Sequence, residues 1–272
     1  MKFTPEMALG TKNVPCNNTG VSFIKTAIKK GYRHIATSPS YSNEKEIGKG
    51  ITGSKVNREE IFITSYVYIE DVGNKNEFIL DTIATSLTNL EVDYIDLLLI
   101  HSHNCDDVKD MWNFISDASD TMLEHKIMNI GVFNYDISKL QETLYGKIKP
   151  YANSIELTPF NFRNNLIKFC KIHSITVFAH GTLGEKSVLN HKILITLANK
   201  RFADPALILI RWNIQQGMVQ VINSASLEHI ETNLKYTEFC LSINDFVFLN
   251  KIENGILFKS QYADVHNLYY SY

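Results

Sequence analysis

The sequence predicts a single (β/α)₈ barrel over residues 1–272, and three observations lead to this prediction. Eight short apolar runs recur along the chain, and segments with a helical spacing of apolar residues lie between them. Runs such as 95–100 are almost continuously apolar, which is typical of parallel strands that helices bury on both faces. A chain of 272 residues with 44% hydrophobic residues is also long enough for one large barrel. Barrels of this class carry their functional site at the C-terminal ends of the strands.

The first half of the chain supplies four of the predicted strands and the helices that follow them. The first helix has one apolar face with Val21, Ile24 and Ile28, and the next begins at about Asn43. The helix after the third strand has a face formed by Phe78, Ile79, Ile83 and Leu87. The four predicted strands span 6–11, 32–36, 61–68 and 94–101.

The second half continues the same alternation. Asp204 and Pro205 form a cap and first-turn pair before a helix that Gly217 closes. Trp112 and Trp212 stand in helical patterns, so we expect them to be packing residues. The predicted strands span 127–133, 152–157, 175–181 and 218–223, and an aromatic C-terminal tail follows at 254–272.

Composition excludes several classes of function. The net charge of -2 and the scattered Lys and Arg residues provide no basic surface for nucleic acid. The chain has neither a secretory N-terminus nor a long uncharged apolar segment, so we expect a cytoplasmic protein without a membrane partner. Cys16, Cys105, Cys170 and Cys240 lie far apart, which favours reduced thiols over a disulfide framework.

Six sequence blocks follow one another along about residues 6–249. They read "GYRHIATSPSYSNEKEIGKGI", "REEIFITSYVY", "VDYIDLLLIHSH", "NIGVFNY", "NSIELTPF" and "AHGTLGE". In this order the six blocks resemble the aldo-keto reductase family. The resemblance implies a barrel that reduces aldehydes and ketones with NADPH bound across its mouth. It also implies four catalytic positions: a tyrosine acid, a histidine that orients the carbonyl, and a lysine paired with an aspartate.

Only two of these four catalytic positions keep the residue of the family. The acid matches Tyr41 and the histidine matches His101, whereas the lysine position reads Tyr66 and the aspartate position reads Ala36. Losing both charges together is physically coherent, because one member left alone would be an uncompensated buried charge that costs roughly 3–5 kcal/mol. Without the ammonium, nothing visible lowers the pKa of the Tyr41 phenol from about 10.

The cofactor contacts implied by the resemblance are also altered. Phe133 and His180 replace a serine and a stacking tyrosine at the nicotinamide end, and Ser154 replaces a glutamine. Asn223 and His229 replace the lysine and arginine that grip the 2′-phosphate. We therefore expect no bound cofactor, or NADPH or NADH if the protein is a reductase. The positions that would still contact it are Asn134, Ser154, Leu183, Ser224 and Asn233.

Three functions remain open from the sequence. The favoured one is a barrel that is catalytically inactive or very weak and acts as a binding, regulatory or structural protein for an unknown small molecule or protein. The second is a divergent NAD(P)H-dependent aldehyde or ketone reductase. The third is new chemistry, for example at a metal held by His101, His103, Cys105 and His180, but the spacing supports no ligand set and we expect no metal. Phe133, Tyr66 and His180 are interpreted as fillers of a vacated pocket.

Overall fold

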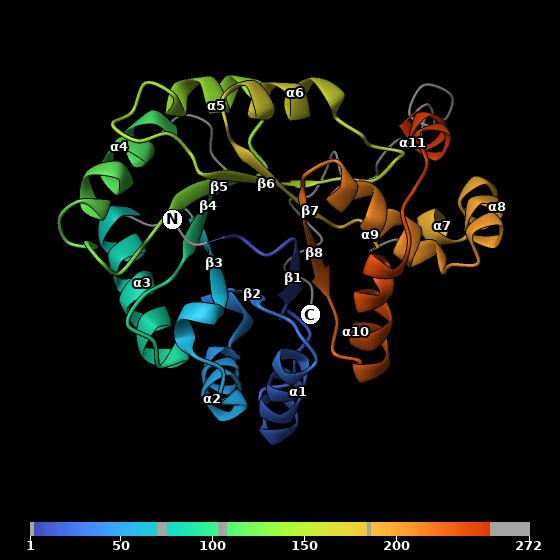
Figure 1. The fold of residues 1–272 in the computed structure, drawn as a ribbon. Coiled ribbons are helices and arrows are strands. Elements are labelled where there is room, and N and C mark those ends of the chain that lie inside the picture. The colour runs from blue at the N-terminus through green and yellow to red at the C-terminus, as the bar shows by residue number, and fades with distance from the viewer. Residues whose placement is uncertain (1–2, 70–74, 103–107, 184–185, 251–272) are drawn as a thin grey trace.

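Eight parallel strands close into a barrel with helices around it in the computed structural model, which describes residues 3–69, 75–102, 108–183 and 186–250 (Figure 1). Each strand pairs with the next in sequence, and β8 returns to pair with β1, Met7 lying opposite Gln220. The strands are β1 (Met7–Gly10), β2 (His34–Thr37), β3 (Phe62–Ile69), β4 (Leu97–Ser102), β5 (Ile130–Phe133), β6 (Ala152–Glu156), β7 (Thr176–His180) and β8 (Val219–Asn223).

The helices lie outside the barrel, where most of them connect successive strands and the last two follow β8. The long helices are α1 (Asn18–Lys29), α2 (Glu44–Ser54), α3 (Lys75–Leu90), α4 (Val108–Ser119), α6 (Asn164–Ile172), α8 (Lys192–Arg201) and α9 (Pro205–Gln215). The shorter ones are α5 (Ile137–Thr143), α7 (Lys186–Leu189), α10 (Leu227–Leu234) and α11 (Ile243–Asn250), with 3₁₀ turns η1 (Pro39–Tyr41), η2 (Arg58–Glu60) and η3 (Lys235–Glu238).

The predicted fold class is confirmed, and each of the eight predicted strands matches a strand of the structure. The second strand is displaced from the prediction, because β2 runs from His34 to Thr37 rather than over 32–36. Strand pairing begins at His34, opposite Phe62, whereas the Tyr32 phenol donates a hydrogen bond to the Ile230 carbonyl outside the barrel. Ala36 is therefore the next-to-last residue of its strand.

The core is divided between the barrel interior and the layer under the helices. A ring of buried side chains inside the barrel includes Ala36, Phe62, Tyr66 and Phe178. Trp112 and Trp212 are fully buried under the helices, as their helical patterns predict. The Asp204 side chain caps α9 by accepting a hydrogen bond from Ala206 N–H at 2.7 Å, which confirms the predicted cap.

Cys16, Cys170 and Cys240 are free thiols, while Cys105, His103 and the tail at 254–272 lie outside the described residues. Within the described ranges, no helix is long and apolar enough to cross a bilayer.

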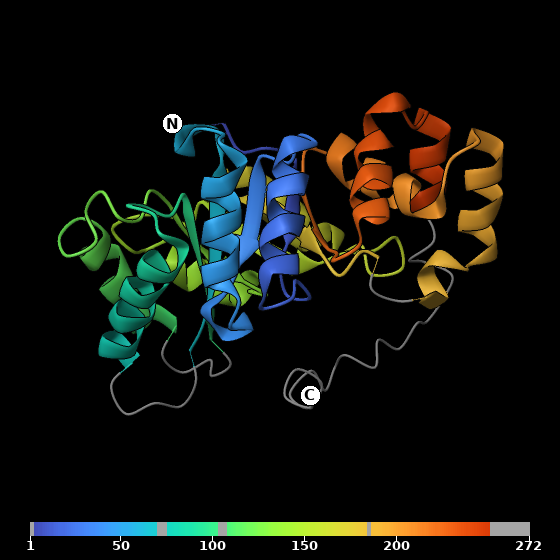
Figure 2. The same ribbon diagram turned by 90° about the horizontal axis from the view of Figure 1, so that it is seen from below.

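Gly48 provides a test of the helix packing, because α1, α2 and α3 follow one another around the barrel (Figure 2). A Cβ on Gly48 would lie 2.4 Å from the Leu90 carbonyl oxygen, a backbone atom at the end of α3. We expect Gly48→Ala to lower the free energy of unfolding by roughly 1–3 kcal/mol, since overpacking outweighs the helix propensity of alanine.

Urea unfolding measures this effect, and Gly53→Ala on the same helix is the control. The nearest atom to a Cβ at Gly53 is Lys25 Cδ at 3.8 Å, so alanine there should be neutral or stabilising. Equal effects of the two substitutions would contradict the close approach of α2 and α3.

Candidate active site at the barrel mouth

Aromatic rings gather at the C-terminal end of the barrel, which we call the mouth. They come from three neighbouring strands and from β7, and side chains two residues apart on β3 lie on the same face. We define the mouth cluster as Tyr66, Tyr68, His101, Phe133 and His180.

Phe133 is at the centre of the mouth cluster. Its ring centroid lies 5.3 Å from that of Tyr66 and 5.0 Å from that of His101, both edge to face. It stacks almost parallel on His180, with the centroids 4.6 Å apart and the planes at 12°. His180 stands where the resemblance places the ring that stacks on nicotinamide, so Phe133 occupies the stacking face of that position.

His180 is held in place as a neutral ring. Burial, and then the positive charge of Arg163, lower the pKa of His180 to about 3. Its Nδ1 lies 3.1 Å from the Ser154 hydroxyl, a hydrogen bond within the barrel wall between β6 and β7. Ser154 therefore has a structural partner at the position where the resemblance implies a carboxamide contact.

Tyr66 and Ala36 fill the place that the resemblance gives to the lysine–aspartate pair. Tyr66 is only 4% exposed, and both residues belong to the apolar cluster inside the barrel. Burial raises the pKa of the Tyr66 phenol, the nearby Tyr68 raises it further, and a hydrogen bond from Ser154 opposes this. Tyr66 is thus an uncharged packing residue, and its carbonyl accepts a hydrogen bond from Ser38 Oγ at 2.8 Å.

Tyr41 and His101 both lie at the mouth. Tyr41 ends η1, directly after β2, and is partly exposed. His101 lies on β4 in register with Tyr68, and the centroids of their rings are 5.4 Å apart. The structure therefore brings the predicted acid and the predicted orienting group to the same end of the barrel, and their catalytic roles stay a prediction.

Among the predicted cofactor contacts, Asn134 has a side-chain acceptor without a hydrogen-bond partner in the described residues, whereas the others pack or form hydrogen bonds within the protein. Asn134 has a left-handed backbone (φ 57°), and its N–H donates to the Ser154 carbonyl at 2.7 Å. The Asn134 side-chain oxygen is buried and has no hydrogen-bond partner among the described residues. Such an acceptor fits the amide N–H of a carboxamide.

Contacts within the protein involve the other three predicted residues, Leu183, Ser224 and Asn233. Leu183 packs against the two hydrophobic clusters beneath the helices. The Ser224 hydroxyl accepts a hydrogen bond from Ser226 N–H at 3.2 Å. Asn233 is buried and hydrogen bonded to the Tyr32 phenol.

The two positions implied to hold a 2′-phosphate carry an amide and an imidazole, and both are exposed. Asn223 ends β8 and packs against the Gly10 backbone. A Cβ added at Gly10 would lie 2.1 Å from Asn223 Oδ1. His229 N–H donates to Ser226 Oγ, the N-cap of α10. NAD(P)H therefore fits these residues in part: Asn134 offers a free acceptor, but Phe133 fills the stacking face and the phosphate contacts are weakened.

Within the described ranges, no three or more His, Cys, Asp or Glu side chains come together as a metal site requires.

The stack of Phe133 on His180 was not predicted from the sequence, where each residue was interpreted only as a filler of a vacated pocket. The spacing of Tyr66 and Tyr68 on one strand face was the available signal for an aromatic cluster.

Comparison with known proteins agrees with this fold. The model of the Aldo/keto reductase family matches residues 6–254. The chain belongs to the aldo/keto reductase family. A glyoxal reductase of Bacillus subtilis is 36% identical over 242 residues, covering 89% of this chain and 86% of that protein. A glycerol 2-dehydrogenase (NADP(+)) of Saccharomyces cerevisiae is 32% identical, covering 91% of this chain and 87% of that protein.

A solved structure supports the same assignment. An aldo-keto reductase from a deep-sea metagenome library of the Medee basin superimposes with a TM-score of 0.84 at 30% identity, covering 93% of each chain. The names of these relatives favour a divergent reductase over a protein without catalysis. They do not support the expectation that no cofactor binds, since members of this family use NAD(P)H.

Proposed function

We propose that this protein is a divergent NAD(P)H-dependent carbonyl reductase with very low turnover. Its family membership, its reductase relatives, and the retained Tyr41 and His101 support reduction of small reactive aldehydes. The observation that carries the low turnover is the stack of Phe133 on His180 at 4.6 Å, which closes the place of the reacting cofactor ring.

The proton-donating side of the reaction is weakened as well. Reduction of a carbonyl needs an acid at the oxygen, and Tyr41 at the mouth is the group in position for it. A phenol with a pKa near 10 donates slowly unless a cation stabilises the phenolate. The neutral Tyr66 and Ala36 supply no such charge. The contribution of acid catalysis to the rate, roughly 10²- to 10⁴-fold, should therefore be reduced.

Turnover measurements test this proposal. With NADPH and methylglyoxal in excess, we expect kcat/KM to be about 10²-fold or more below that of the Bacillus subtilis glyoxal reductase measured alongside. Tyr41→Phe should abolish the remaining activity, because it removes the acid. A value of kcat/KM within about tenfold of the relative would contradict the proposal.

A second candidate is a ligand-binding protein without catalysis, which the filled stacking face favours. The same assay separates the two functions. Turnover by the unmodified protein that does not exceed the rate without protein would favour the second candidate.

A further inference from the structure

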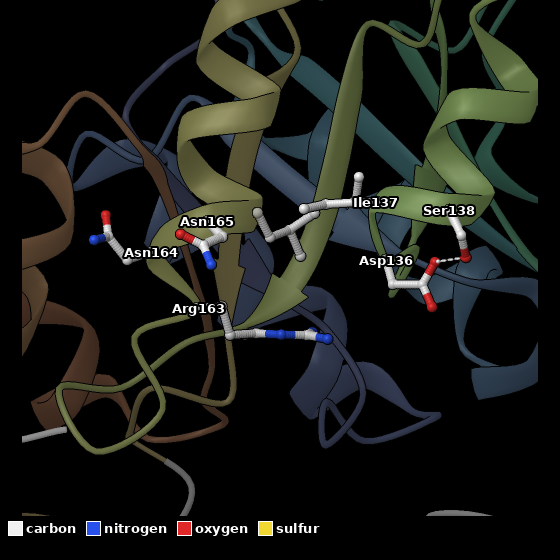
Figure 3. Close-up of a pocket in the computed structure, with 7 residues that line it drawn as sticks. Asp136, Ile137, Ser138, Arg163, Asn164 and Asn165 are labelled. Carbon is white, nitrogen blue, oxygen red and sulfur yellow. Dashed lines mark hydrogen bonds between the residues drawn. The ribbon is translucent and has the colours of Figure 1, made fainter. Parts of the chain in front are cut away.

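A cavity lies outside the mouth cluster, between the start of α5 and the start of α6. It has a volume of about 700 Å³, within the range of small-molecule sites. Ile137 and Leu166 provide apolar surface, while Asp136, Arg163 and Asn165 provide charge and an amide (Figure 3). No residue that we place in carbonyl reduction lines it.

Arg163 brings an unpaired positive charge to this cavity. Its side chain is partly buried and makes no hydrogen bond or ion pair with any residue that the structure describes. In Figure 3 the guanidinium extends across the opening toward the side where Asp136 lies. A guanidinium presents a planar fork of donors that matches a carboxylate.

Asp136 brings a fixed negative charge to the opposite side. It is the N-cap of α5, and its Oδ1 accepts hydrogen bonds from Lys139 N–H at 2.9 Å and from Ser138 Oγ at 2.8 Å. Burial acts to raise the pKa of Asp136, but these hydrogen bonds outweigh it and lower the pKa. The carboxylate is therefore ionised near neutral pH and held by the helix it caps.

The arrangement of these groups selects one class of ligand. A simple anion would bind Arg163 but be repelled by Asp136. A simple cation would bind Asp136 but be repelled by Arg163. We propose that the cavity binds a small zwitterion with an aliphatic side chain, such as a free amino acid. Its carboxylate would pair with Arg163, its ammonium with Asp136, and its side chain would cover Ile137 and Leu166.

Calorimetric titration of the full-length protein with L-leucine tests the proposal. We expect saturable binding, and about tenfold or more weaker binding of isovalerate and of isoamylamine, which each keep one charge. Isovalerate that binds as tightly as leucine would overturn the zwitterion. Absence of saturable leucine binding up to about 10 mM would overturn the site.

Two variants and a control locate the binding. Arg163→Gln and Asp136→Asn should each weaken leucine binding about tenfold or more, and asparagine preserves the N-cap of α5. Lys168→Gln removes an exposed cation of α6 that does not line the cavity, so it should leave the affinity unchanged. Unchanged leucine affinity in either of the first two variants would overturn the assignment.

Discussion

Replacing Tyr66 by lysine should lower the free energy of unfolding by about 3–5 kcal/mol near pH 7, the largest effect we expect from a single substitution. Tyr66 is buried among Ala36 and the ring of Phe133, and neither can compensate an ammonium. The lysine would therefore be an uncompensated charge in a poorly solvated place, or would lose its proton.

The pH dependence of this loss has a defined sign. Burial depresses the pKa of the lysine in the folded state below its unfolded value of about 10.4. At pH values between these two pKa values, the unfolded state binds more protons than the folded state. Stability of the variant should therefore rise, relative to the unmodified protein, from about pH 7 to about pH 9. Urea unfolding at both pH values measures it.

A matched substitution at the surface provides the control. Tyr145 is 87% exposed, so Tyr145→Lys should change the free energy of unfolding by less than about 0.5 kcal/mol. If Tyr66→Lys were as harmless as Tyr145→Lys, the mouth would be more polar and better solvated than the structure indicates.

Adding Ala36→Asp to Tyr66→Lys should recover part of the lost stability, because the new carboxylate compensates the ammonium. We do not expect appreciable reduction of a reactive aldehyde from this double variant. Phe133 still covers His180, and Asn223 and His229 still replace the phosphate-binding cations.

The limits of sequence-based prediction differ between the fold and the site. The strands could be predicted because each is a short apolar run, and because strand ends bring Tyr41, His101 and Phe133 to one end of any such barrel. The stack of Phe133 on His180 could not, because it depends on the side-chain rotamers of two strands that are not neighbours.

Other features depend on contacts between distant segments. The burial of Asn233 against Tyr32 follows from how α10 packs on the barrel, which no local pattern encodes. The cavity with Arg163 and Asp136 forms where two βα loops meet, and each residue alone is an ordinary surface charge in the sequence.

Phe133→Ser should strengthen NADPH binding about tenfold. An aromatic stack of this kind contributes roughly 0.5–1.5 kcal/mol, and it must be broken before another ring can lie on His180. Removing the phenyl ring eliminates that competition, and a gain of about 1.4 kcal/mol corresponds to a tenfold change in the dissociation constant. The serine also restores a residue type that the family uses at this position. Phe202→Ser is the control, since Phe202 is exposed next to α8.

Calorimetric titration of NADPH into the unmodified protein, Phe133→Ser and Phe202→Ser tests most directly whether the mouth cluster closes the cofactor site. We expect a dissociation constant weaker than about 100 µM for the unmodified protein and for Phe202→Ser, and about tenfold tighter binding for Phe133→Ser. A micromolar or tighter dissociation constant for the unmodified protein, unchanged by Phe133→Ser, would show that the stack of Phe133 on His180 does not obstruct the cofactor.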